Sequence, residues 1–560
     1  MIPSIWSVVC NTQRPMAEAS EGSLKAGVPT RAASPDQTVA ASPTVSPNRF
    51  ALTTERRRAL RISLALFVST FLIYWLLGPM HTAYDFQLSQ ANNIVHGHLD
   101  MDPAYTNNLT ILERVLFDGE GFCLPLPDPR AAQGNTYTIP VQQTADCRHF
   151  MQHSLGPAFL LAPLALFFGL TVNQTLISAL IGALAAPVVW GITRRFSDRL
   201  RTQLALTALA MFGTTFFYSA ADGSVWHFAH TTAVFFTFGA IYATVVTRSP
   251  LLAGAFVGAA FMCRPTMILA GFFPLVAFSD LWLVPARDAA TSAWRRLRDR
   301  IRLRPLIKLA VGVAPFVLLT MAINYLRFGK PFESGYSYTE QIYQADLAWV
   351  YPYGIFDPRY VSRHIQTFFE QMPNFSDRGS YVWPSWAGMA LWAVSPALLI
   401  GLFAGLQRYR RPSLLVVGAV ALSCTFIVGA AVLKGLGLAD LNPADVPFGM
   451  HLWPFWILIG AALTLAIADR NRLVLACWAA IIPLVTINWV FAATGWAQFG
   501  YRYGLDFMPF LFMLVVLAVR RVRWYHAVLI GAAIAINLWG VLWIHKFDAI
   551  ELFGWTWVSY

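Results

Sequence analysis

Charged residues are scarce in this 560-residue chain, at 12%, whereas apolar residues make up 56%. Soluble globular domains have about 25% charged and about 45–50% apolar residues, so the composition excludes an ordinary soluble protein. The apolar residues form blocks of about 18–22 residues, the length that a helix needs to cross about 30 Å of hydrocarbon. The strict alternation over about ten residues that marks membrane β-strands is missing. The sequence therefore predicts an all-α, polytopic helical membrane protein.

Cysteine is also rare, with 6 residues and none of the spacings of a zinc site. Cys263, Cys424 and Cys477 lie in apolar blocks and are expected to be small core residues. Cys123 and Cys147 share one polar segment. In an oxidising compartment they could form a disulfide, and two separate thiols are the alternative. A glycine-rich phosphate loop is missing too, so we do not expect a nucleotide-driven cytoplasmic engine.

Acidic residues, at 29, are outnumbered by 41 basic ones. The arginines stand in short clusters beside apolar blocks, which is the pattern of cytoplasmic loops rather than of a nucleic-acid surface. We therefore expect no nucleic-acid partner. Residues 1–58 are polar and lack the charged start and apolar core of a signal peptide, which predicts a disordered cytoplasmic tail.

The arginine clusters predict how the chain threads the membrane. A first span at 62–79 follows a basic run and leads to a large outer loop at 80–154. The apolar segment 155–170 is short and contains two prolines, and counting it as a span would place Arg194–Arg201 outside. We expect it to be an interfacial or re-entrant helix. The predicted spans, about thirteen with the C-terminus outside, are 62–79, 171–193, 203–221, 229–246, 251–263, 266–284, 306–326, 386–406, 413–433, 451–468, 473–493, 505–519 and 526–544.

This threading divides the chain into four parts. They are a tail (1–58), an N-terminal transmembrane catalytic module that includes the outer loop (59–330), a second large outer loop (331–385) and a C-terminal transmembrane module (386–560).

The first outer loop holds the acidic candidates. Asp85 lies six residues beyond the first span, where partial desolvation suits a carboxylate to act as a general base. The alternative is a solvated acid or the N-cap of a short helix. Asp100 and Asp102 could bind a divalent cation, or they could start the turn at Pro103.

A second group combines Asp222, His227 and His230. On a helix the histidines share a face, since they are three residues apart. Together with the carboxylate they could contact a metal or a phosphate. Interfacial histidines with satisfied hydrogen bonds are the alternative.

Two arginines stand where the charge rule disfavours them. Arg264 lies at a turn between apolar segments, where it is a functional candidate or a snorkelling side chain. Arg502 lies at the outer start of the segment 505–519. Something anionic must compensate it, either Asp506 structurally or a phosphate functionally, because guanidinium binds phosphate bidentately.

From about residue 61 to 509, the sequence resembles the C-type, multi-spanning bacterial glycosyltransferases that use polyprenyl-phosphate sugars. This group includes protein O-mannosyltransferases and the lipid A aminoarabinose transferase. The matching features are Asp85 after the first span, Ala91, His96-Gly97-His98-Leu99-Asp100, Gly156-Pro157 with Pro163, Gly254 to Arg264-Pro265, Asn324-Tyr325-Leu326-Arg327-Phe328-Gly329-Lys330-Pro331 with Gly335-Tyr336, and Gly500-Tyr501-Arg502-Tyr503.

The resemblance implies an inverting transfer of a hexosyl or pentosyl unit at the outer face of a bacterial inner membrane. The acceptor would be a cell-surface glycan, glycolipid or protein. Asp85 would be the base. The donor-phosphate set would be Arg264, Arg502, Tyr501 and Tyr503. Many relatives have two acids where Phe86 follows Asp85 here, so a share for Asp100 or Asp102 stays open. Some relatives need a divalent metal and others do not. A transporter or flippase for lipid-linked glycans is the competing class, although no internal repeat supports it. A scaffold protein is the third.

Overall fold

The computed structural model describes residues 49–82, 84–106, 114–117, 148–279, 303–336, 351–375, 382–385, 388–405, 456–457, 459–460, 471–495 and 498–546. It divides into two units, Met1–Arg57 and Arg58–Tyr560. The tail before residue 49, Cys123, Cys147 and Cys424 lie outside the described residues. Helix α1 (Arg49–Leu77) begins before the predicted end of the tail at residue 58.

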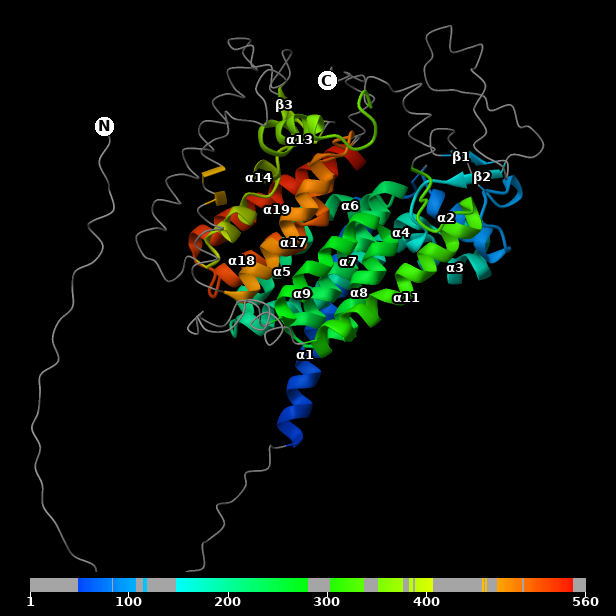
Figure 1. Ribbon diagram of the computed structural model, residues 1–560. Helices are drawn as coiled ribbons and strands as arrows, with labels where there is room; N and C mark the ends of the chain where they lie inside the picture. Colours follow the sequence, from blue (N-terminus) through cyan, green and yellow to red (C-terminus); the bar gives the residue numbers. More distant parts are fainter. Residues whose placement is uncertain are drawn as a thin grey trace, which may run out of the picture. The chain divides into compact units, whose positions relative to one another are not determined.

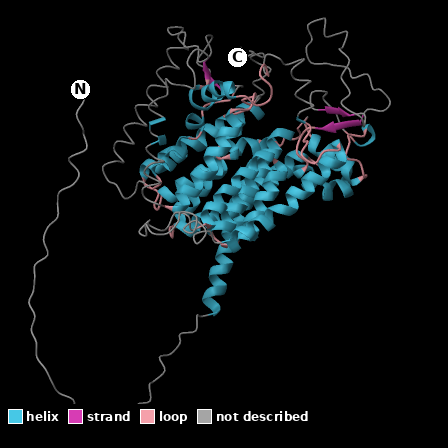
Figure 2. Cartoon of the chain, in the orientation of Figure 1, coloured by secondary structure: helices cyan, strands magenta, loops and turns pink. Residues whose placement is uncertain are grey.

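The described part of the second unit is almost entirely helical (Figures 1 and 2). Two short antiparallel hairpins are the exception. One pairs β1 (Arg114–Phe117) with β2 (Arg148–Met151), and the other pairs β3 (Asn374–Phe375) with β4 (Val382–Trp383). The remaining elements are α2 (Phe86–Val95), η1 (Pro103–Tyr105), α3 (Gly156–Phe168), η4 (Gly169–Thr171), α4 (Gln174–Phe196), α5 (Leu200–Phe212), α6 (Phe216–Asp222), α7 (Val225–Val245), α8 (Pro250–Cys263), η5 (Pro265–Gly271), α9 (Phe272–Phe278), α11 (Leu303–Phe328), η6 (Pro358–Tyr360), α13 (Val361–Ile365), η7 (Gln366–Glu370), α14 (Leu391–Val394), η8 (Pro396–Phe403), α17 (Arg472–Trp489), η12 (Arg502–Asp506), α18 (Met508–Ala518) and α19 (Trp524–His545).

Six described helices are long and apolar enough to cross a membrane, which confirms a helical membrane protein. They are Thr54–Leu77, Gln174–Phe196, Val225–Val245, Leu303–Phe328, Arg472–Trp489 and Trp524–His545. The pair α5–α6, bent by 57°, makes up to seven. The described residues do not support the predicted count of about thirteen. Helices α8 and α18 and the pair η5–α9 are shorter than a full span, and the predicted span 413–433 lies outside the described residues.

Asparagine and serine side chains start several of these helices. The Asn173 side chain accepts a hydrogen bond from Leu176 N at the start of α4, and Ser249 caps α8 in the same way. Asn471 accepts from two backbone N–H groups at the start of α17. Such caps satisfy N–H groups that have no partner within the helix, and they fix where each helix begins.

We name the two ends of the set of helices after one residue at each, the Gly78 end and the Arg520 end. At the Gly78 end, Lys546 Nζ donates to Gly78 O (2.9 Å) and Asn173 Nδ2 donates to Met80 O (2.8 Å). At the Arg520 end, Ser197 Oγ donates to Arg520 O (3.1 Å). Helix α4 therefore runs from the Gly78 end to the Arg520 end, and α19 runs back.

Helix α3 both begins and ends at the Gly78 end. Gln87 Nε2, on the neighbouring α2, donates to Ser154 O just before α3, and Asn173 just after it contacts Met80 O. Thirteen residues of helix reach only about 20 Å. The two ends of the segment predicted as 155–170 therefore lie at the same end of the helices, and this segment is shorter than a full span. It packs beside α2 near the β1–β2 hairpin (Figure 1).

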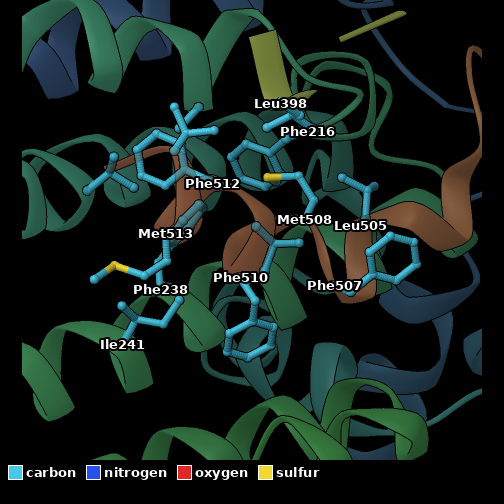
Figure 3. Packing of buried hydrophobic residues seen from close by; sticks show 14 of the residues in the cluster. Phe216, Phe238, Ile241, Leu398, Leu505, Phe507, Met508, Phe510, Phe512 and Met513 are labelled. Atoms are coloured by element: carbon cyan, nitrogen blue, oxygen red, sulfur yellow. The ribbon is translucent and has the colours of Figure 1, made fainter. Parts of the chain in front are cut away.

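The core lies between α4, α5, α7, η8, α17 and α18. Figure 3 shows the aromatic centre of this cluster, where the rings of Phe238 and Phe512 meet edge to face with centroids 5.9 Å apart. Cys263 and Cys477 are buried in it as free thiols, which confirms the predicted role of both. Helices α8 and α11 approach closely at Gly254, where an added Cβ would lie 2.1 Å from Leu309 O.

Candidate functional site

Most predicted site residues gather at the Gly78 end. Asp85 occupies the N-cap position of α2, but its side chain makes no capping hydrogen bond. Its backbone carbonyl accepts from Leu88 N and Ser89 N instead. The side chain is half-buried, so it stands at the border between the helices and the loop. The predicted alternative, that Asp85 is the N-cap of a short helix, is confirmed for its position but without a side-chain capping hydrogen bond.

The neighbours of Asp85 reach toward residues 151–154. The Tyr84 ring lies 5.1 Å from that of Trp226, and the Trp226 ring lies 6.4 Å from His153. Phe86, on the other side of Asp85, is buried against Met151. The acid thus belongs to the same packed region as the segment that precedes α3.

Asp102 serves the turn that the sequence offered as an alternative. Its Oδ1 accepts from Ala104 N (2.8 Å) at the start of η1. His98 lies 3.8 Å from the Asp102 carboxylate and 3.6 Å from that of Asp100. Across the described residues, no group of three or more His, Cys, Asp and Glu could hold a metal ion. The divalent-cation alternative for Asp100 and Asp102 thus has no support among the described residues.

Asp222 and His227 meet as the sequence predicts. His227 Nδ1 lies 3.0 Å from Asp222 Oδ1 and 2.9 Å from Ser224 Oγ. His545, from α19, lies 3.9 Å from the second oxygen of Asp222 and stacks on Tyr218 at 4.9 Å. This first cluster joins α6, α7 and α19.

His230 does not share that carboxylate. It lies 3.4 Å from Asp506, a buried carboxylate with 1% of its side chain exposed. Arg264 donates to the same carboxylate from Nε (2.8 Å) and Nη2 (3.0 Å). Thr266 and Asn488 add hydrogen bonds to Oδ2. The predicted Asp222–His227–His230 group is therefore divided between two carboxylates.

Arg264 and Arg502 lie on one aromatic ring. Their guanidinium carbons are 5.6 and 5.5 Å from the centroid of Tyr503. Arg264 is compensated by Asp506, whereas the sequence offered Asp506 as the partner of Arg502. Arg502 is 7% exposed, and its Nε has no hydrogen-bond partner in the described structure. The structure brings Arg264 and Arg502 together, but Asp506 pairs with Arg264 and not with Arg502.

Tyr501, predicted to bind the donor phosphate, forms a hydrogen bond with His364 instead. Its hydroxyl lies 2.8 Å from His364 Nδ1, and His364 Nε2 lies 2.7 Å from Phe491 O. A carbonyl oxygen only accepts, so Nε2 carries the proton and Nδ1 accepts from Tyr501. Burial lowers the pKa of His364 to about 4, and Arg363 adds to the decrease against the opposing Phe491 hydrogen bond. His364 was missed from the sequence, because it lies in the five-residue helix α13 without a motif.

Sequence reasoning also assigned no role to Arg327. This residue is 4% exposed near the end of α11, and it lines a small cavity of about 40 Å³ with Ser154 and Tyr336. Arg327 could have been found in the same way as Arg502, because it too is an arginine at the predicted outer end of a span.

Comparisons with protein-family models, with curated proteins and with solved structures gave no match to this chain. The arrangement of side chains at the Gly78 end is therefore the basis for a functional assignment.

Proposed function

We propose that the protein is an inverting glycosyltransferase that moves a sugar from a polyprenyl-phosphate donor to a cell-surface glycan, glycolipid or protein. The observation that carries the proposal is the gathering, at one end of the helices, of a half-buried acid and several buried arginines. A lipid-linked phosphosugar has a matching shape, with an apolar tail, an anionic phosphate and a polar sugar.

In this proposal the Gly78 end faces the outside of a bacterial inner membrane. The basic residues of the Arg520 end support that orientation, because arginines concentrate in cytoplasmic loops. Arg195, Arg199 and Arg520 line one recess there. Including the shorter apolar helices and the undescribed segments, we propose about thirteen crossings.

The chemistry assigns Asp85 as the base. Its carboxylate takes the proton of the acceptor hydroxyl, whose oxygen bonds to the anomeric carbon as the bond from that carbon to the phosphate oxygen breaks. Inversion follows from attack opposite the leaving group. The polyprenyl phosphate departs with the electron pair, and a guanidinium placed where this charge develops lowers the barrier. Because Arg264 is already paired with Asp506, we assign this role to a buried arginine that keeps an unpartnered nitrogen, as both Arg502 and Arg327 do.

The test is sugar transfer by purified protein from a polyprenyl-phosphate sugar in detergent or nanodiscs. A positioned general base contributes about 10²–10⁴-fold, so Asp85→Asn should slow transfer by that factor. Asp198→Asn makes the same change on an exposed acid at the Arg520 end and should leave the rate unchanged. Asp100→Asn decides whether a second acid shares the work.

Equal turnover by wild type and Asp85→Asn would remove Asp85 from the mechanism. Movement of the lipid across vesicles without release of polyprenyl phosphate would overturn the transferase in favour of the flippase.

A further inference from the structure

The cavity beside Arg327 lies between the ends of three helices. Its walls are the segment that enters α3, the C-terminal turn of α8 and the last two turns of α11. On α11, Thr320, Asn324 and Arg327 line it at spacings of four and three residues, which places them on one helix face. The cavity thus has a built polar wall rather than scattered surface groups.

Arg327 is held rigidly on this wall. One Nη donates to Met151 O, and the guanidinium lies over the rings of Phe150 (5.5 Å) and Phe328 (4.7 Å). Its Nε has no hydrogen-bond partner in the described structure, and no described carboxylate forms an ion pair with it. A buried charge is costly unless it is paired, so this guanidinium is suited to an anion that the protein itself does not provide.

The beginning of α3 adds a second favourable feature. Ser154 and Gly156 line the cavity at the beginning of α3, a helix of 13 residues. The N-terminus of a helix carries partial positive charge and unpaired N–H groups, which attract phosphate oxygens. The guanidinium and the helix start therefore favour an anion in the same space.

The cavity also has an apolar part. Phe261, Met262 and Ile323 contribute to its lining, beside the polar residues Gln152, His153, Ser334 and Tyr336. Beside it, α11 exposes Leu319 and Leu326, with 44% and 70% of their surface uncovered. An exposed apolar helix face next to an anion site suits a ligand with a charged head and a long hydrocarbon chain.

We propose that this cavity receives the phosphate of the lipid carrier, with Arg327 as its direct contact and α11 as the track for the chain. The identity of the lipid rests on the proposed function, whereas the phosphate site rests on the cavity itself. We do not assign the first contact to Arg264, because its Nε and Nη2 already donate to Asp506, which compensates its charge.

The experiment measures binding of polyprenyl phosphate, without sugar, to the full-length protein in nanodiscs. Arg327→Gln should weaken binding by about 10- to 100-fold, the usual effect of losing a charged hydrogen bond. Lys330→Gln removes an exposed positive charge at the same helix end and should change affinity less than about threefold. Asn324→Trp fills the cavity without touching the Arg327–Met151 bond and should also abolish tight binding. It keeps the test valid if Arg327→Gln fails to fold.

Polyprenol and inorganic phosphate separate the two parts of the ligand, and both should bind far more weakly than polyprenyl phosphate. Equal binding of polyprenol, or unchanged affinity in both cavity variants, would overturn the site. Inorganic phosphate that binds as tightly as the lipid would overturn the track for the chain. If Arg327-dependent binding is found but no sugar is ever transferred, the site stands and the transferase fails.

Discussion

Asp506 is the carboxylate on which the charge network at the Gly78 end depends, and its replacement should be among the most damaging single changes. The side chain is 1% exposed and compensates Arg264 through two hydrogen bonds of 2.8 and 3.0 Å. Asp506→Asn presents an N–H group to donors and leaves the guanidinium without a counter-charge. Breaking one side of a buried pair costs about 3–5 kcal/mol, so the free energy of unfolding should fall by that amount.

A double-mutant cycle isolates the pair. Asp506→Leu with Arg264→Met removes both charges and replaces them with apolar groups of similar size, which is often close to neutral for a buried pair. The double variant should therefore be more stable than the sum of its single variants predicts, with a coupling of about 1–3 kcal/mol. Unfolding in a denaturant titration of the detergent-purified protein measures each corner of the cycle.

The chain offers a matched control at its surface. Arg359 donates to Asp357 with nearly the same geometry, 2.8 and 2.9 Å, but 59% of the arginine side chain is exposed. Asp357→Asn should leave unfolding unchanged, because solvent screens an exposed pair. Additive losses in the buried cycle, or equal losses at Asp357 and Asp506, would refute the assignment of Asp506 as the centre of the network.

Two further predictions concern the loop and the helix packing. The neutral His364 binds no proton until pH about 4, whereas the unfolded chain takes one up near pH 6.5. Stability is therefore full above pH 6.5 and falls by about 3 kcal/mol as pH drops to 4. His364→Gln should flatten this part of a melting-against-pH profile, and an unchanged slope would contradict the assignment. Gly254→Ala forces α8 from α11 and should destabilise by about 1–3 kcal/mol in the same assay. Gly531→Ala, which meets nothing within 4 Å on α19, should be neutral or stabilising, and equal effects would argue against the close contact.

Composition and charge pattern were enough to predict the helical membrane class, because this class depends on local quantities, namely the length of apolar blocks and the arginines beside them. The Asp222–His227 contact was equally accessible, because five residues and one helix start separate the two. The breaks within pairs such as η5–α9 were not accessible, since no hydropathy pattern fixes them.

The pairing of the buried charges could not be predicted for a different reason. Arg264 and Asp506 are 242 residues apart, and Arg502 stands one turn from Asp506 in the sequence. Proximity along the chain offered Asp506 as one of two partners for Arg502, with a phosphate as the other. The structure sends Arg502 and Arg264 to the Tyr503 ring but gives the carboxylate to Arg264 alone. The sequence can identify an arginine that needs an anion. Tertiary packing decides which arginine the fold leaves unpaired, and this separates a structural guanidinium from one that is available to a ligand.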